Sequence, residues 1–165
     1  MLRMRDEALP ARQYRRIQAK YRGRLGVEVG LFVAVDHLRR AGQLTPAEEQ
    51  LYFDIDDWFD ERLPHPPFYE DGNSIGAVTW FRASLPETMI LRISQMRVIL
   101  DLHGVQHEQV WSNDPGQLVY ADEFQVGVIP QVRHDPTPMP EGLTLGPTAA
   151  GSKRALARPR LDPPA

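Results

Sequence analysis

The chain has 165 residues, of which 42% are hydrophobic, and its mean hydropathy is −0.41. This length and balance suit a single globular domain with a sizeable core. No apolar run reaches the length of about 18 residues that a membrane span requires, so we expect no membrane association. The absence of cysteine excludes disulfides, thiol nucleophiles and cysteine-ligated metals.

The formal net charge of −3 conceals an uneven distribution along the chain. Residues 1–24 carry eight basic and two acidic side chains, a net charge of +6, whereas residues 25–130 carry six basic and seventeen acidic ones, a net charge of −11. Such a layout informs about partners and solubility rather than about fold. The N-terminus lacks the apolar stretch of a signal peptide, so we expect a cytoplasmic protein.

The N-terminal part of the chain is predicted to be helical. Residues 1–10 are expected to be flexible. From residue 11, Tyr14, Ile17 and Tyr21 recur at helical spacing among arginines, which predicts a basic helix that ends at the glycines that follow. A second helix is expected over 27–41, with arginines in its last turn.

Two capping-box patterns predict further helix starts. Thr45 is followed by Pro46 and, three residues after the threonine, by Glu48, so each end of the box can satisfy a backbone amide. The helix that follows would have a strongly acidic outer face and form an αα-hairpin with the preceding helix. Ser84 and Glu87 form the second pattern, ahead of a helix that would end at residue 103.

The second half of the chain has the composition of strands. Apolar stretches over 75–82, 105–111 and 117–129 predict them, and the first is apolar on both faces, which is typical of a central strand. We therefore predict an α+β fold: N-terminal helices with the αα-hairpin, then β-α-β-β in a small mixed sheet of three to four strands. The first two strands would be parallel, and the helices would lie mainly on one face.

The domain limits follow from composition. One α+β domain would span residues 11–130 and begin with the basic helix. Residues 131–165 are rich in proline, glycine and alanine without apolar periodicity, which predicts a disordered tail.

The carboxylate at residue 122 allows two interpretations of the last strand stretch. In an uninterrupted strand, Asp122 would share a face with Tyr120 and Phe124 and point into a pocket. Alternatively, a turn at Asp122 and Glu123 divides the stretch into two short strands. The turn is the simpler interpretation.

Motifs for nucleotide binding, zinc proteolysis, esterase activity and EF-hand calcium binding do not occur, and we predict no cofactor and no metal site. The residues between 69 and 73 offer carboxylates and an amide to a partner, or simply form a turn that bonds its own backbone. The candidate binding residues are Tyr69, Asp71, Asn73, Trp80, Arg15, Arg16 and Arg22.

Three hypotheses for the function follow. The charge layout favours a non-enzymatic interaction or regulatory protein, whose basic helix docks on a protein partner or on a second copy. The second is a small metal-assisted hydrolase or group transferase near the turn at 70–74, with catalytic candidates Asp71, Asp122, Glu123, His103 and His107. The third is nucleic-acid binding through residues 11–24, which the acidic body makes less favourable.

Three segments also carry a family resemblance. Residues 66–73 (PPFYEDGN), 78–81 (VTWF) and 120–126 (YADEFQV) resemble a pattern in small, uncharacterised bacterial proteins, chiefly actinobacterial. The resemblance covers residues 11–130 and implies a domain boundary, but no catalytic residue.

Overall fold

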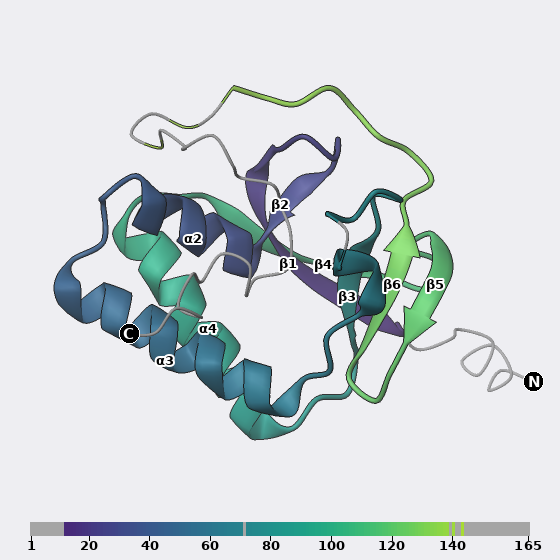
Figure 1. Ribbon diagram of the computed structural model, residues 1–165, viewed down its shortest axis with the longest axis horizontal. Helices are drawn as coiled ribbons and strands as arrows, with labels where there is room; N and C mark the ends of the chain where they lie inside the picture. The colour runs from purple at the N-terminus through teal and green to yellow at the C-terminus, as the bar shows by residue number, and fades with distance from the viewer. Residues whose placement is uncertain (1–11, 71, 139, 141–142, 144–165) are drawn as a thin grey trace, which may run out of the picture.

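The structure is a computed structural model that describes residues 12–70, 72–138, 140 and 143. In these residues a six-stranded antiparallel sheet is accompanied by three α-helices that lie to one side of it (Figure 1). The elements in chain order are β1 (Tyr14–Arg22), β2 (Glu28–Gly30), α2 (Leu31–Arg40), α3 (Pro46–Arg62), the 3-10 helix η1 (Pro67–Tyr69), β3 (Val78–Arg82), α4 (Glu87–Leu102), β4 (His107–Ser112), β5 (Gln117–Ala121) and β6 (Gln125–Ile129).

The predicted basic helix at the N-terminus is wrong, because residues 14–22 form the long strand β1. Ile17, Ala19 and Tyr21 alternate along it and are buried in the core on the helix side. Tyr14 is buried on the opposite face of the sheet. Since both faces of β1 are covered, the strand lacks the simple polar–apolar alternation of a half-exposed strand. The second predicted helix starts later than expected, because residues 28–30 form β2.

The predicted mixed sheet of three to four strands is also wrong. The sheet has six strands, and all its recorded pairs are antiparallel. β3 and β4 each pair antiparallel with β1, so they run in the same direction, but β1 lies between them. The unexpected strand therefore accounts for the loss of the predicted parallel pair.

One edge of β1 is shared by two strands. Tyr14 and Arg15 pair with β3 and β4 at once, and Gln18 pairs with β2 and β4. Because a strand has only two edges, β4 occupies one of them, and β3 and β2 follow each other along the other. β2 and β3 diverge from each other next to residues 16 and 17 of β1, and we call this gap in the sheet the fork.

The main core lies between the sheet and helices α2, α3 and α4 (Figure 1). Its largest fully buried apolar side chains include Tyr52, Phe59, Ile55 and Met96. The predicted capping box of α3 is confirmed: Thr45 Oγ1 accepts from the Glu48 amide at 3.1 Å, and the Thr45 amide donates to Glu48 Oε1 at 2.9 Å. The second predicted box is wrong, because α4 starts after Pro86 without a side-chain cap.

The other face of the sheet has a smaller apolar cluster, and a segment from the far end of the chain is bonded to the turn after β1. Tyr14, Val78, Val126 and Val128 form the cluster. After β6 the chain runs across the molecule to β2 (Figure 1), and we call residues 133–137 the strap. Backbone bonds join it to the turn after β1: the His134 amide donates to Gly26 O at 2.8 Å, and the Thr137 amide to Arg22 O at 3.3 Å.

Two further observations bear on the sequence predictions. Residues 131–137, assigned to the tail from composition, belong to the described part of the chain and include the strap. Within the described residues, no helix combines the length and the hydropathy needed to span a membrane.

Candidate functional site

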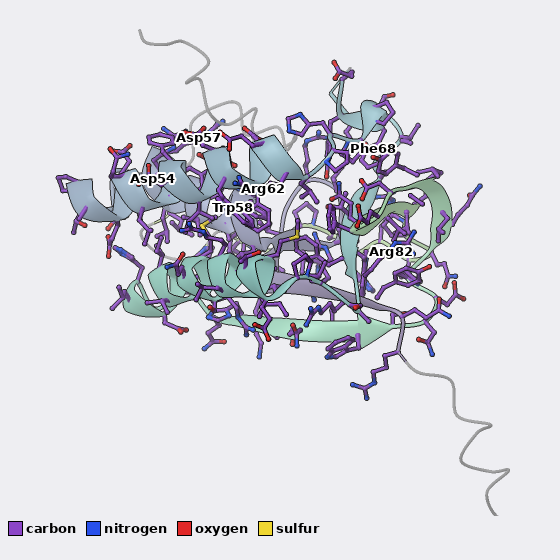
Figure 2. All side chains as sticks on the ribbon, turned by 90° about the horizontal axis from the view of Figure 1, so that it is seen from below. Asp54, Asp57, Trp58, Arg62, Phe68 and Arg82 are labelled. Carbon is purple, nitrogen blue, oxygen red and sulfur yellow. The ribbon has the colours of Figure 1, made fainter. Side chains whose placement is uncertain are left out.

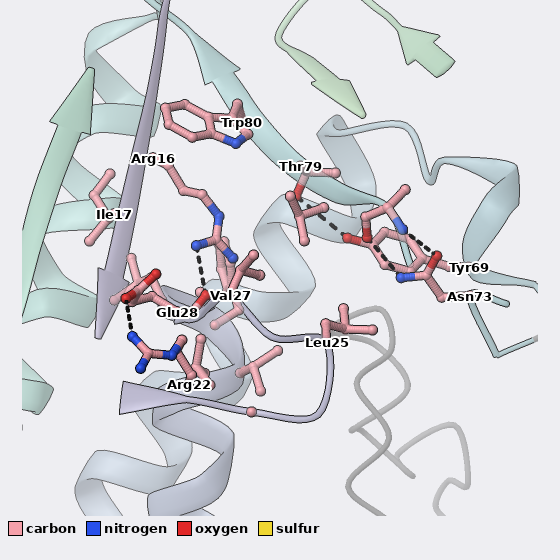
Figure 3. A pocket seen from close by; sticks show the side chains of 18 of the residues that line it. Arg16, Ile17, Arg22, Leu25, Val27, Glu28, Tyr69, Asn73, Thr79 and Trp80 are labelled. Atoms are coloured by element: carbon pink, nitrogen blue, oxygen red, sulfur yellow. Dashed lines mark hydrogen bonds and ion pairs between the residues drawn. The ribbon is translucent and has the colours of Figure 1, made fainter. Parts of the chain in front are cut away.

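A cleft of about 430 Å³ opens at the fork between β2 and β3 (Figure 3). Its volume lies within the range of roughly 300–1,000 Å³ that is usual for small-molecule sites. Its walls come from β1, the turn and strand after it, the start of α2, the connection from α3 to β3, β3 itself and the strap. The apolar lining includes Ile17, Leu25, Val27, Leu31, Phe32, Leu63, Val78, Trp80 and Phe81.

Arg16 extends from the fork into this cleft, between Trp80 and the segment that carries Val27 and Glu28 (Figure 3). Its Nη1 donates to Gln18 Oε1 and to the backbone oxygen of Glu28, both at 2.8 Å. Within the described part of the chain, its Nε and Nη2 have no recorded hydrogen-bond partner. Burial lowers the pKa of Arg16 to about 10, against the opposing effects of Tyr69 and Glu28. The guanidinium stays charged at neutral pH and offers two nitrogens to a ligand.

Gln18 holds the Arg16 side chain in place through a second link. Its Nε2 donates to Glu108 Oε2 on β4 at 3.1 Å, while its Oε1 accepts from Arg16. On the other side, Arg16 Nη2 lies 3.2 Å from the position that a β-carbon would take on Gly30. A glycine at the end of β2 therefore gives the guanidinium its room, and the charge is positioned before any ligand arrives.

The charges around the cleft are mainly positive. Its ionised lining side chains are Arg16, Arg22, Arg24 and Glu28. Arg22 Nη1 pairs with Glu28 Oε2 at 3.3 Å, and Arg24 is exposed at the mouth. Helix α2 begins beside the cleft after Gly30, without a side-chain cap and without an acidic residue in its first turn. The partial positive charge of this helix end adds to that of Arg16, so the cleft favours an anion although residues 25–130 are acidic.

The connection between α3 and β3 forms another wall of the cleft. Asn73 is buried with a φ of 56°, and its side chain both donates to and accepts from the backbone of Ala77, at 2.8 and 2.9 Å. Asn73 thus bonds the backbone of its own turn, which is the second of the two interpretations given for residues 69–73 in the sequence analysis. The Phe68 ring packs across Gly127 of β6, which fixes η1 and with it Tyr69, whose hydroxyl lies 3.5 Å from Thr79 Oγ1.

A buried polar pair lies at the helix side of the cleft. Tyr21 Oη and His37 Nδ1 are 2.8 Å apart, and His37 lines the cleft. Burial, with a smaller contribution from the charge of Arg40, lowers the pKa of His37 to about 4. Burial also raises the pKa of Tyr21. Both groups are therefore neutral at pH 7, and His37 adds no second charge to the cleft.

The fold brings most of the predicted binding residues together. The cleft is lined by Arg16, Arg22, Tyr69, Asn73 and Trp80, which come from three separate stretches of the sequence. Asp71 lies outside the described residues. Arg15 is elsewhere: its guanidinium carbon lies 5.2 Å from the ring centroid of Trp111 on β4, and burial lowers its pKa. Sequence reasoning missed His37, whose place in an amphipathic helix gave no sign of a cavity beside it.

The predicted catalytic carboxylate Asp122 belongs to the turn between β5 and β6, as the simpler interpretation required. Its Oδ1 accepts from the amides of Phe124 and Gln125, and its Oδ2 accepts from Tyr120 Oη at 2.7 Å. Burial, together with this bond, raises the pKa of Tyr120 to about 12. Glu123 is exposed in the same turn. These hydrogen bonds give Asp122 a structural role in the turn.

The two candidate histidines contact other carboxylates. His103 Nε2 lies 2.8 Å from Glu48 Oε1, and the bond from the Thr45 amide, together with this one, lowers the pKa of Glu48. His107 Nε2 lies 2.6 Å from Asp101 Oδ1. Neither histidine is bonded to Asp122 or Glu123 in the described structure. Among the residues that are described, no three His, Asp or Glu side chains are grouped as a metal ion would require.

The acidic face of α3 is separate from the cleft. Asp54 and Asp57 point outward from this helix (Figure 2), whereas Trp58 contacts Arg62, whose guanidinium carbon lies 4.4 Å from the ring centroid. The recorded contacts of Arg15, Arg16 and Arg22 do not include α3. The basic N-terminal segment and the acidic helix are thus not ion-paired with each other through these arginines.

Comparisons with protein-family models, with curated proteins and with solved structures found no match. The resemblance of the three sequence segments to a bacterial family stays a prediction.

Proposed function

We propose that this protein binds a small organic anion in the cleft at the fork of the sheet, as a non-enzymatic binding or regulatory protein. The observation that carries the proposal is the Arg16 guanidinium, which is held by Gln18 and Glu28 inside a largely apolar cleft and has two further nitrogens available. A charge that the fold places in such surroundings is costly to keep without a counterion, and an anionic ligand supplies one.

The proposal keeps the regulatory class favoured by the sequence but assigns a different role to the basic segment. Arg16, Arg22 and Arg24 give a positive cleft within an acidic molecule. Field lines focus in such a cleft and raise the local concentration of anions. His37 lines the cleft, is bonded to Tyr21 and is neutral at pH 7, so the positive side-chain charge of the cleft comes from the arginines.

The test is a binding survey with the purified full chain. Small carboxylates, phosphate esters and sulfonates should raise the melting temperature, and isothermal titration calorimetry should give one site per chain. Replacing Arg16 with Gln should weaken binding by about 10- to 100-fold, since a hydrogen bond to a charged group contributes about 1.5–3 kcal/mol.

A matched control is available on the same strand. Lys20→Gln removes one positive charge from an exposed position of β1 outside the cleft and should leave the affinity unchanged within about twofold. Equal weakening by both variants would mean that only the net charge matters. No binding by any anion would contradict the proposal.

A second candidate function, self-association, is favoured by the outer face of α4. Leu91, Val98 and Leu102 are 56%, 52% and 67% exposed and lie along one stripe of the helix with Gln95 between them. The stripe carries no formal charge, so the same stripe on a second copy can face it without repulsion. Sedimentation should give twice the mass of one chain, and Leu91→Lys with Val98→Lys should return the mass of one chain. A single chain at all concentrations would exclude it.

Nucleic-acid binding through residues 11–24 stays a prediction with less support. Arg16 lies in the cleft, and Arg15 stacks on Trp111, so the two arginines do not present one common surface to a phosphate backbone.

A further inference from the structure

We infer that the anion bound in this cleft is an amphipathic monocarboxylate, whose carboxylate sits on the Nε–Nη2 edge of Arg16 and whose uncharged body lies along the apolar walls. The inference rests on the proposed function and names its ligand class.

The donor geometry of Arg16 selects the head group. Both hydrogens of Nη1 are taken by Gln18 Oε1 and Glu28 O. The side of the guanidinium formed by Nε and Nη2 is left, and it presents two parallel N–H groups in one plane. Two parallel donors match the two oxygens of a carboxylate. The amide of Gln18 is itself bonded to Glu108, so the plane of the guanidinium is fixed before binding.

The remaining charges argue against a dianion such as a phosphate monoester. Arg22 is paired with Glu28 and also donates from Nε to Asp135 O at 3.0 Å. Arg24 is exposed at the mouth, and its recorded bond is to Gly72 O at 3.4 Å. A phosphate has three oxygens to satisfy and a second charge to neutralise. One guanidinium edge suits a single negative charge.

The lining of the cleft indicates the chemistry of the rest of the ligand. Beyond Arg16 the lining is formed by Ile17, Leu31, Phe32 and Leu63 on the helix side, and by Val27 and Trp80 on the other. His37, which lines the cleft on the helix side, is neutral at pH 7 because burial lowers its pKa to about 4. A second charge on the ligand would have no partner there, so the body of the ligand is uncharged and apolar.

The experiment compares head groups and chain lengths by calorimetry on the full chain. Straight-chain carboxylates should bind, with the dissociation constant falling about fourfold for each added methylene until the cleft is filled. Alcohols of equal length should bind at least about tenfold more weakly, because they cannot pair with Arg16. Alkyl phosphates should also bind at least about tenfold more weakly, since, of the described residues that line the cleft, only Arg24, which is exposed at its mouth, remains to pair with their second charge.

Variants locate the carboxylate. Arg16→Lys keeps the charge but removes the planar fork, and it should weaken carboxylate binding at least about tenfold. Gly30→Ala places a β-carbon 3.2 Å from Nη2, crowds the same edge and should weaken binding by several-fold. Lys20→Gln should bind like the unaltered protein. Circular dichroism establishes that each variant is folded, and the head-group selectivity of the unaltered protein needs no variant at all.

The outcomes separate this inference from the function on which it rests. Phosphates that bind as tightly as carboxylates, in an Arg16-dependent manner, would overturn the ligand class and leave anion binding intact. An affinity that does not change with chain length would also overturn the inference that the body of the ligand is apolar. Absence of binding by every anion would overturn both.

Discussion

The two faces of the sheet differ in how they are closed. Helices α2, α3 and α4 seal one face with a large apolar core, in which Tyr52, Ile55 and Phe59 have no exposed surface. The opposite face has a four-residue cluster, against which Leu25, Val27 and Trp80 pack, and the strap is bonded to the turn after β1. The cleft opens at the fork beside β1.

This difference suggests a division of labour between stability and binding. Loops held by a few hydrogen bonds open at lower free-energy cost than a sealed core, and ligand sites are commonly drawn from such regions. Truncation of apolar side chains on the helix side should therefore act mainly on the free energy of unfolding, and truncation of apolar side chains at the fork mainly on affinity.

Truncating the sealed core should have the largest effect. Phe59→Ala removes a fully buried ring and should lower the free energy of unfolding by about 3–5 kcal/mol. Urea denaturation measures the loss, and binding by the fraction that remains folded should be unaltered. The matched variant Val27→Ala, at a half-buried position beside the cleft, should cost less than half as much. Equal losses would contradict the division.

Substitution of Gly76, which contacts Arg133 of the strap, should give the next largest loss of unfolding free energy. Gly76 has a φ of 67°, and a β-carbon there would lie 2.8 Å from Arg133 Nη2, which donates to Gly76 O. Gly76→Ala should cost about 2–3 kcal/mol from strain plus displacement of Arg133. Gly42, on the helix side, has a φ of 72° but open space around it, so Gly42→Ala should cost only about 1 kcal/mol.

Comparing the losses of unfolding free energy in Gly76→Ala and Gly42→Ala shows how much the contact with Arg133 contributes. If Gly42→Ala proves as costly as Gly76→Ala, the backbone angle alone explains both, and Arg133 contributes nothing measurable at this point.

The polar pair between the two regions should make stability depend on pH. The folded pKa of His37 is lowered to about 4, below the unfolded value near 6.5, so its neutral burial costs nothing above pH 6.5. As the pH falls through this window, the unfolded state binds the proton first. Stability should drop by about 2 kcal/mol between pH 7 and pH 5. Urea titrations at both values measure the drop, which His37→Gln should largely abolish.

The smallest loss of unfolding free energy is expected for substitutions at the N-terminal ends of helices. Thr45→Ala removes the cap of α3 and should cost about 1 kcal/mol. Ser84→Ala should be close to neutral, because α4 has no side-chain cap although the sequence pattern is the same. A similar loss at both positions would show that Ser84 caps α4 in solution. Chemical denaturation resolves this difference when both variants are measured together.

Short-range patterns in the sequence predicted the local features well. Thr45 and Glu48 lie one helical turn apart, and their reciprocal bonds need no partner from elsewhere in the chain. The turn at Asp122 is likewise closed by Phe124 and Gln125, its immediate neighbours. Such features are closed within a few residues, although the same pattern at Ser84 and Glu87 does not cap α4.

The strand β1 was missed for a physical reason. Tyr14, Ile17 and Tyr21 fit helical spacing, and arginine, glutamine, alanine and lysine between them all favour helices. Pairing with three other strands overrides this preference. Because β1 is covered on both faces, its buried side chains fall at both parities and hide the two-residue period.

The candidate site was predictable only as separate residues. Arg16, Tyr69 and Trp80 each stood out for their chemistry, but only the divergence of β2 and β3 makes them neighbours. That divergence requires β1 to pair with β3 as well as with β2, and the pairing of residues 14–15 with residues 81–82 joins distant segments, which no local pattern encodes.

The strap gives the far end of the chain a place in the proposed site. Pro136 and Thr137 form part of the cleft wall, and Arg133 donates to Leu25 O and Gly76 O, both at 2.8 Å, on the two sides of the fork. A protein shortened at residue 130, where composition suggests the domain ends, would keep its six strands and three helices yet lose this brace. Any trimmed version intended for ligand screening should therefore retain the residues through at least 138.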